Sequence, residues 1–167
     1  GVTEGFNLCV APETLIRTRE GGDEISCYEN QDVEIWNGEE FSKVTVRKTG
    51  ENQELIKIIF NELSWSGTRE LNCTRYHKFY IMENDKEVMY RAEQLKPGMK
   101  LIDYNDPQSG ELRDNNYVKE VIDEGRKDDT FCFTEPKRNK GWFNGVVCGQ
   151  CLEITEPSTV NSIASCN

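Results

Sequence analysis

Short runs of alternating apolar and polar residues, separated by turn signals, fill most of the chain. In FSKVTVRK at 41–48, Val44 and Val46 fall on one face and the residues between and beside them on the other. Similar short runs are VEIW, ELIKIIF, HKFYIM, EVMY, MKLIDY, YVKEVI, TFCFTE and WFNGVV. Turn formers such as TGENQ, MENDKE, KPGMK and FNGV separate them. This spacing predicts an all-β domain.

Two segments depart from the strand pattern. RAEQL at 91–95 predicts one helical turn, ended by Pro97 and Gly98. YNDPQSGELRDNN at 104–116 is polar and rich in turn formers, so we expect an exposed or disordered loop.

The overall charge and hydropathy exclude some classes of partner. Thirty acidic against twenty basic residues give a net charge of −10, which argues against a nucleic-acid partner. The longest apolar runs, such as LIKIIF at 55–60, are far shorter than a membrane span, and no basic segment followed by an apolar one begins the chain. We therefore expect one compact soluble unit, without membrane or nucleic-acid partners, in the cytoplasm of a cell or of a virus-infected host.

Seven cysteines are many for 167 residues, but their number is odd and their spacing irregular, unlike a secreted disulfide scaffold. CGQC at 148–151 has the form of a redox pair, although it lacks the βαβ setting of thioredoxin-like proteins. With one histidine and no second Cys-x-x-Cys, the chain is a poor candidate for a zinc site. We expect no metal and no cofactor.

The two ends of the chain read as one sequence once the middle is removed. Deleting 9–150 joins GFNL to CLEITEPS. The residues of both flanks are mostly small and polar. This predicts an insertion between Leu8 and Cys151.

Four blocks of the middle, in order, resemble those of an intein, a self-excising segment with the Hint fold shared with hedgehog autoprocessing domains. The blocks are CVAPETLIRTREG, GTRELNCTRYHKFYI, RAEQLKPGMKLI and DTFCFTEPKRNKGWFNGVVCGQC. The resemblance implies a horseshoe of about a dozen short strands with pseudo-two-fold symmetry. It also implies a single-turnover reaction of the chain on itself, with no external substrate.

The flanks resemble the large subunit of ribonucleotide reductase, which has an Asn-Leu-Cys-x-Glu-Ile stretch and a later Cys-Asn pair. The resemblance divides the chain into a host remnant at 1–8, a mini-intein at 9–150 and a second host remnant at 151–167. The segment between Leu101 and Asn116, where larger inteins carry a homing endonuclease, is too short for one. The implied partners are the chain's own host segments, and we expect a monomer.

The resemblance assigns a role to each site residue. Cys9 attacks the carbonyl of Leu8 and turns that amide into a thioester, while Thr74 and His77 stabilise the oxyanion. His77 also protonates the departing amide nitrogen, a role that suits a pKa near the working pH. Cys151 then takes over the acyl group.

Two further residues complete the implied reaction. Cys132 stands where inteins usually have Asp or sometimes Cys, and it helps to couple the steps. Gln150 cyclises and cuts the bond to Cys151, after which an S-to-N shift joins Leu8 to Cys151.

The chain departs from the intein pattern at its end. Most inteins end in His-Asn, whereas this segment ends in Gly149-Gln150, and Asn139 stands near the place of a second missing histidine. We therefore expect cleavage at Gln150–Cys151 to be slow. Other residues are expected only to pack in the interior: Cys27, Cys73, Cys148, Phe131, Trp142 and Phe143.

Two other functions remain open at this point. The chain is either a Hint domain that cleaves without joining, or a binding or thiol-disulfide module that uses Cys148 and Cys151. Oxidation of Cys9 or Cys151, or a metal held between them, is a further hypothesis for regulation.

Overall fold

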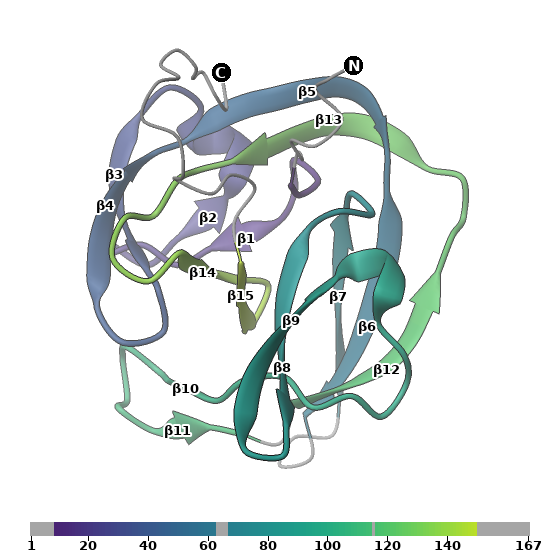
Figure 1. The fold of residues 1–167 in the computed structure, drawn as a ribbon. Helices are drawn as coiled ribbons and strands as arrows, with labels where there is room; N and C mark the ends of the chain where they lie inside the picture. Colours follow the sequence, from purple (N-terminus) through teal and green to yellow (C-terminus); the bar gives the residue numbers. More distant parts are fainter. Residues whose placement is uncertain (1–8, 63–66, 115, 150–167) are drawn as a thin grey trace.

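The computed structural model describes residues 9–62, 67–114 and 116–149, and within these ranges strands are the main secondary structure (Figure 1). Two short 3₁₀ helices, Ile25–Tyr28 and Ala92–Gln94, are its helical elements there. The all-β prediction is confirmed. In the described ranges the strands are β1 Leu15–Ile16, β2 Asp23–Glu24, β3 Asp32–Trp36, β4 Phe41–Thr45, β5 Arg47–Glu54, β6 Ile56–Glu62, β7 Thr68–Cys73, β8 Lys78–Glu83, β9 Lys86–Arg91, β10 Tyr104–Asn105, β11 Leu112–Arg113, β12 Asn116–Ile122, β13 Lys127–Cys132, β14 Lys140–Phe143 and β15 Val146–Gly149.

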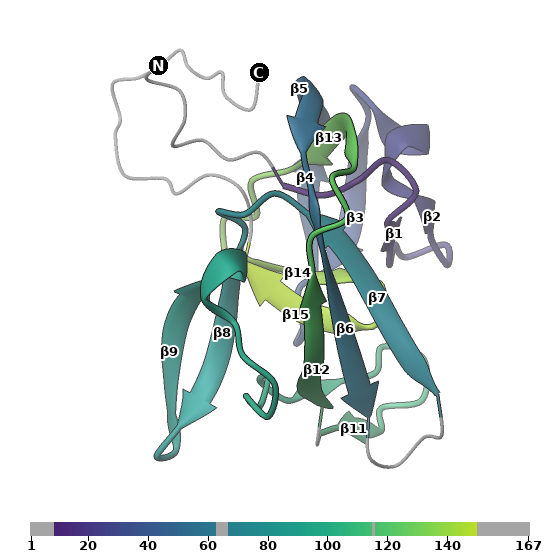
Figure 2. The same ribbon diagram turned by 90° about the vertical axis from the view of Figure 1, so that its right-hand side faces the viewer.

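A long curved pair of antiparallel strands frames the molecule. β5 pairs with β13 and β6 pairs with β12, so two continuous stretches of chain run side by side around it (Figure 1). The N–H of Leu55 donates to the carbonyl of Arg126 (2.9 Å) where one pairing passes into the other. β7 adds to β6 on the side away from β12, and Figure 2 shows these three strands running alongside one another.

The β14–β15 hairpin contacts both β1 and β8, which are far apart in the sequence. β14 pairs with β1, while β15 packs against β8 (Figure 1). Its two-residue turn has positive φ at Asn144 (49°) and Gly145 (98°), as type I′ hairpin turns require. The FNGV turn signal is thus confirmed. Because of this hairpin, the end of β15 is carried into the centre of the molecule.

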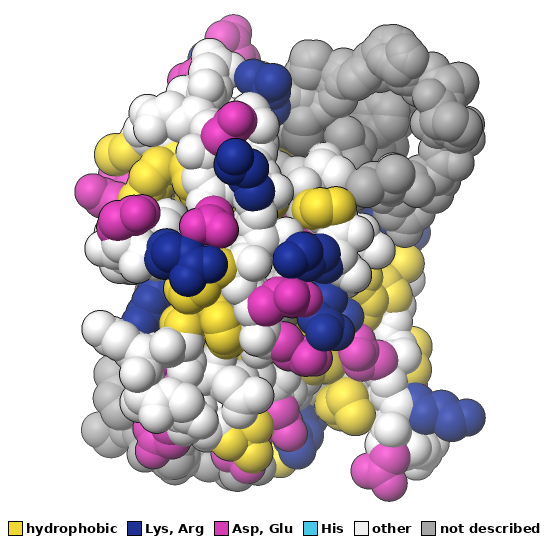
Figure 3. Space-filling model, turned by 90° about the vertical axis from the view of Figure 1, so that its left-hand side faces the viewer, with side chains coloured by type: hydrophobic (Ala, Val, Ile, Leu, Met, Phe, Trp, Pro, Cys, Tyr) yellow, Lys and Arg dark blue, Asp and Glu magenta, His cyan; other side chains and the backbone are white. Residues whose placement is uncertain are grey.

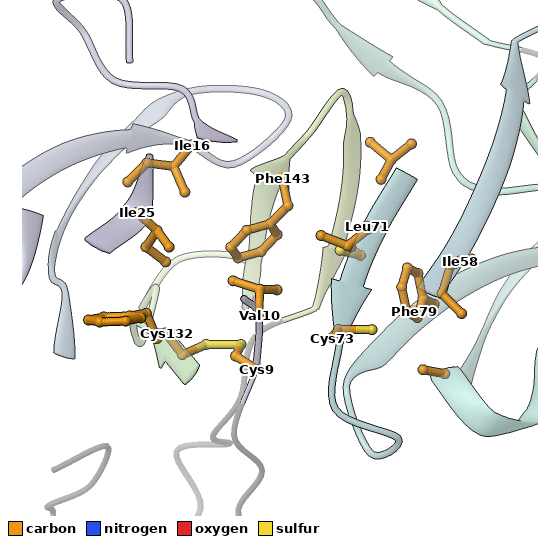
Figure 4. Close-up of a cluster of buried hydrophobic side chains, with 14 of the residues drawn as sticks. Cys9, Val10, Ile16, Ile25, Ile58, Leu71, Cys73, Phe79, Cys132 and Phe143 are labelled. Atoms are coloured by element: carbon orange, nitrogen blue, oxygen red, sulfur yellow. A yellow bond between two sulfur atoms is a disulfide. The ribbon is translucent and has the colours of Figure 1, made fainter. Parts of the chain in front are cut away.

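The principal core lies between these elements and reaches the start of the described chain (Figure 4). Cys9 and Val10 are completely buried, and Phe131 and Phe143 are buried as predicted. Val44 and Val46 also face inward, which confirms the alternation at 41–48.

Two local predictions need correction. Residues 104–116 are not simply a loop, because β10 and β11 pair there and Asp106 accepts backbone hydrogen bonds from Gln108 (2.8 Å) and Ser109 (3.2 Å). MKLIDY does not form one strand, since only isolated bridges at Lys100 and Leu101 precede β10.

Charges of both signs are mixed on the surface shown in Figure 3. Basic side chains have acidic neighbours, as with Arg19 and Glu34 (2.7 Å) and Arg138 and Glu39 (3.1 Å). No helix within the described ranges is both long and apolar enough to cross a membrane.

Candidate active site

The Thr-x-x-His motif forms a tight turn between β7 and β8. The N–H of His77 donates to the carbonyl of Thr74 (3.1 Å), the i to i+3 bond of a β-turn. The carbonyl of His77 in turn accepts from the N–H of Ala92 (2.8 Å), in the helical turn after β9. The spacing of three residues therefore places both side chains on one turn, and the third sequence block anchors that turn.

Backbone hydrogen bonds hold Cys9 between this turn and β13. The N–H of Val10 donates to the carbonyl of Phe131 (3.1 Å), and the N–H of Phe131 donates back to Val10 (3.0 Å). The carbonyl of Cys9 accepts from the N–H of Thr74 (2.9 Å), and the Thr74 hydroxyl approaches the same oxygen (3.5 Å). The first, second and fourth sequence blocks thus meet at Cys9.

Cys9 and Cys132 form a disulfide in this structure, with their Cα atoms 5.4 Å apart. Both residues are completely buried (Figure 4). Sequence reasoning gave both residues roles as thiols and raised oxidation of Cys9 as a hypothesis, but it did not pair Cys9 with Cys132. In this state the Cys9 sulfur is not available as a nucleophile, because the thiolate is the reactive form.

The imidazole of His77 lies between cysteines from opposite ends of the domain. Its Nδ1 is 3.5 Å from Cys9 Sγ, and its Nε2 is 3.2 Å from Cys148 Sγ. The rings of Phe79 and Phe143 meet it edge-on, with centroids at 5.1 and 5.6 Å. One completely buried side chain therefore touches both the first and the last part of the described segment.

Burial lowers the pKa of His77 to about 3, because desolvation disfavours the imidazolium and the charge of Lys78 acts in the same direction. The expectation of a pKa near the working pH is therefore wrong for this state. At neutral pH the ring is uncharged, with one nitrogen as hydrogen-bond donor and the other as acceptor.

Buried neutral histidine predicts a specific loss of stability in acid. The unfolded chain takes up the His77 proton below about pH 6.5, whereas the folded chain resists until about pH 3. The contribution of neutral His77 to the free energy of unfolding is thus fully present above pH 6.5. It falls as the pH drops toward 3, by up to about 5 kcal/mol. Urea unfolding of the oxidised chain at a series of pH values measures this. His77→Gln should flatten the slope in that window, and an unchanged slope would contradict the assignment.

Cys148 is the residue that sequence reasoning missed. It was assigned to packing, and it is completely buried, but its sulfur also contacts the histidine. Burial and the nearby Cys73 raise its pKa well above the usual range, so it stays a thiol. A thiol of this kind is a poor redox nucleophile, which weighs against the reading of CGQC as a redox pair. The one sequence signal for this contact was a cysteine in the otherwise apolar strand at the end of the described chain.

The other cysteines assigned to packing differ from each other. Cys73 is buried as predicted, and burial raises the pKa of its thiol. Cys27 is exposed, so the packing prediction is wrong there. Trp142 is only partly buried, with its indole N–H donating to the hydroxyl of Tyr104 (3.2 Å).

Gly149 ends β15 against β8, where a side chain has no room. A Cβ at this position would lie 2.8 Å from Lys78 Cβ and 3.0 Å from the Lys78 carbonyl oxygen. This close approach accounts for glycine in place of a penultimate histidine.

Some of the remaining predicted site residues lie outside the part of the chain that the structure describes. Leu8, Gln150 and Cys151 lie outside the described residues. Asn139 is exposed in the turn before β14 with a φ of 61°, a conformation that asparagine tolerates. Its role as a substitute for histidine stays a prediction. In the described ranges, no group of three or more His, Cys, Asp or Glu side chains is arranged to hold a metal ion.

The fold defined by these elements is that of inteins. A variant of the Ssp DnaB mini-intein superposes with a TM-score of 0.69 at 19% identity, covering 89% of this chain and 97% of that one. A DnaB intein from Synechocystis sp. PCC 6803 gives 0.67 at 19% identity, covering 86% and 99%. The TvoVMA intein gives 0.67 at 17% identity, covering 84% and 96%. The Hint fold class is thereby confirmed.

One curated relative is similar in sequence. The ribonucleoside-diphosphate reductase large subunit of Invertebrate iridescent virus 6 is 42% identical over 115 residues, covering 60% of this chain. The match is 12% of that protein's length, so the chain corresponds to about an eighth of it. The matched 60% of 167 residues is about 100, and the two flanks supply only 8 and 17. At least about 75 matched residues therefore lie within 9–150. The chain matches no protein-family model.

Proposed function

We propose that residues 9–150 form an intein that excises itself and joins residues 1–8 to residues 151–167. The observation that carries the proposal is the contact of one histidine with Cys9 on one side and Cys148 on the other. These cysteines are 139 positions apart, yet a splicing element needs its two ends at one site. The intein fold and the similarity to a reductase large subunit that extends into the middle of the chain support it further.

The first step forms a thioester after the Cys9–Cys132 disulfide has been reduced. The Cys9 sulfur bonds to the carbonyl carbon of Leu8, the bond to the Cys9 nitrogen breaks, and that nitrogen gains the proton that the thiol loses. Donors at the oxyanion, for which Thr74 and His77 are the candidates, contribute about 3 kcal/mol each in comparable sites. A neutral His77 assists by donating a hydrogen bond from Nδ1.

The second step transfers the acyl group from Cys9 to the sulfur of Cys151 and leaves a branched chain. Cys132 is bonded to Cys9 in the oxidised state, so its thiol remains beside the Cys9 sulfur after reduction. We assign it the acid–base role that Asp has in most inteins. A thiol is a weaker acid than a carboxyl group, so this transfer is expected to be slower.

The third step releases the segment. The side-chain amide nitrogen of Gln150 attacks its own backbone carbonyl, closes a six-membered ring and breaks the bond to Cys151. The freed amine of Cys151 then takes the acyl group from its own sulfur, and the Leu8–Cys151 peptide bond is complete. The host would be a ribonucleotide reductase large subunit, and neither cofactor nor external substrate takes part.

The final cleavage should be the slow step, so the branched species should accumulate. Gln150 has one torsion more to freeze than asparagine, and Gly149 has no side chain to donate to the scissile carbonyl. The branched species has the mass of the precursor but runs apart from it on a denaturing gel, because its chain is branched. Hydroxylamine cleaves its thioester, so the branched band disappears as residues 1–8 are released. A time course in reductant, sampled with and without hydroxylamine on gels and by mass spectrometry, measures it.

The outcomes of this time course separate the possible functions. Splicing gives the branched species, then the excised 142-residue segment and a joined peptide. A domain that cleaves without joining gives separate flanks, and a thiol-disulfide module leaves both junctions intact. Gln150→Asn should quicken the last step by roughly two- to fivefold. Gly149→His is not a matched variant, because its Cβ would collide with Lys78. Absence of a branched, hydroxylamine-sensitive band while joined peptide forms would contradict the slow-step prediction.

A further inference from the structure

The hydrogen atoms around His77 follow from the chemistry of its two sulfur neighbours. In the disulfide, Cys9 Sγ carries no hydrogen, so in the 3.5 Å contact with Nδ1 the ring nitrogen is the donor. A neutral imidazole has one N–H, so Nε2 then has a lone pair. Cys148 Sγ, 3.2 Å from Nε2, must donate its S–H to it.

The protonation states agree with this assignment. Burial lowers the pKa of His77 to about 3, so the ring carries one hydrogen at neutral pH. Burial raises the pKa of Cys148, so the thiol keeps the hydrogen it must donate. Both side chains are completely shielded from solvent, and water does not compete for either nitrogen.

We propose that Cys148 is a positioning residue for His77, whose thiol donates to Nε2 and holds the imidazole in the tautomer with Nδ1–H toward Cys9. Reduction of the disulfide returns a hydrogen to Cys9, after which either tautomer would satisfy that contact. We infer that Cys148, already the donor to Nε2 in the oxidised chain, then favours the same tautomer. Its catalytic consequence rests on the proposed function, since only that tautomer has a donor ready at the first junction.

Because of its position, Cys148 connects the first junction, Leu8–Cys9, with the second junction, Gln150–Cys151. Cys148 pairs with Gly141 in the β14–β15 hairpin, one residue before Gly149. The strand that leads to the second junction therefore sets the proton position at the first. If β15 leaves its place beside β8, His77 loses its partner and the preference for Nδ1–H.

The chain's single histidine allows the tautomer to be read directly. We would label histidine with ¹⁵N in a precursor carrying Gln150→Ala and Cys151→Ala, which halts the reaction after the first step, and record the ring nitrogens by NMR in a phosphine reductant. The parent and Cys148→Ser should show protonated Nδ1 and bare Nε2. Cys148→Ala should show both tautomers, whereas Cys73→Ala, which removes another buried thiol, should match the parent. Protonated Nε2 in the parent, or an unchanged tautomer in Cys148→Ala, overturns the proposal.

A kinetic readout in the same precursors tests the consequence. Hydroxylamine should release residues 1–8 about three- to tenfold more slowly from Cys148→Ala, the effect of losing one hydrogen bond, and Cys148→Ser should restore most of the rate. Backbone amide spectra verify that each variant is folded. If the parent releases nothing, the proposed function fails while the tautomer result still stands. If the parent reacts and Cys148→Ala keeps both rate and tautomer, only the positioning role fails.

Discussion

Cys9→Ala is expected to lower the release of residues 1–8 and the yield of joined peptide below detection, a loss of at least roughly a thousandfold. Every later bond change depends on the thioester at Cys9, and alanine has no nucleophile. The Cys9 sulfur is the one that His77 Nδ1 contacts. The neighbouring Cys132 cannot replace it in an N-to-S shift, because Cys132 does not follow Leu8 in the chain. Gels and mass spectrometry of the reduced chain, with and without hydroxylamine, measure both products.

Cys27→Ala is the matched control for this prediction. Cys27 is an exposed free thiol on the first 3₁₀ helix, so removing it changes the number of cysteines without touching the site. It should splice at the rate of the parent chain. Joined peptide from Cys9→Ala would show that the acyl transfer begins elsewhere.

The oxidised chain is expected not to splice, and adding a reductant should start the reaction. In the Cys9–Cys132 disulfide, the first nucleophile is bonded to the residue that is proposed to assist it. Oxidation therefore removes both groups at once, and the loss should be complete while the disulfide lasts. Intact-mass analysis of alkylated samples gives the oxidation state, and the gel time course gives the rate.

Cys132→Ser separates disulfide formation from other effects of the reductant. This variant lacks the disulfide partner that Cys9 has among the described residues, so hydroxylamine should release residues 1–8 from it even without a reductant, although more slowly than from the reduced parent. An oxidised parent chain, with its disulfide verified, that reacts as fast as the reduced one would contradict the prediction.

Local sequence signals predicted most of the strands and turns, but TGENQ at 49–53 is wrong as a turn, because these residues lie within β5. The dipeptide Asn144-Gly145 determines its hairpin because both residues tolerate positive φ, and the alternation around Val44 determines which face is buried. The loop at 104–116 was mispredicted because its polar composition hides a short β-pair held by Asp106.

Only those parts of the site that lie within short sequence motifs were predictable. The spacing of Thr74 and His77 marks a turn, but the pairing of Cys9 with Cys132 joins residues 123 positions apart, which no local pattern encodes. The low pKa of His77 comes from the burial that the whole fold imposes. Cys148 looked like a core residue because it is one, and its hydrogen bond appears only when β15 is placed beside the turn.

The central claim is that residues 9–150 leave the chain and the flanks become one peptide. Tandem mass spectrometry of the small products after incubation in reductant tests it most directly. The account predicts a 25-residue peptide, GVTEGFNLCLEITEPSTVNSIASCN, with fragment ions that span a Leu8–Cys151 bond. Flanking peptides recovered only as separate 8- and 17-residue products, or a chain that stays whole in reductant, would contradict it.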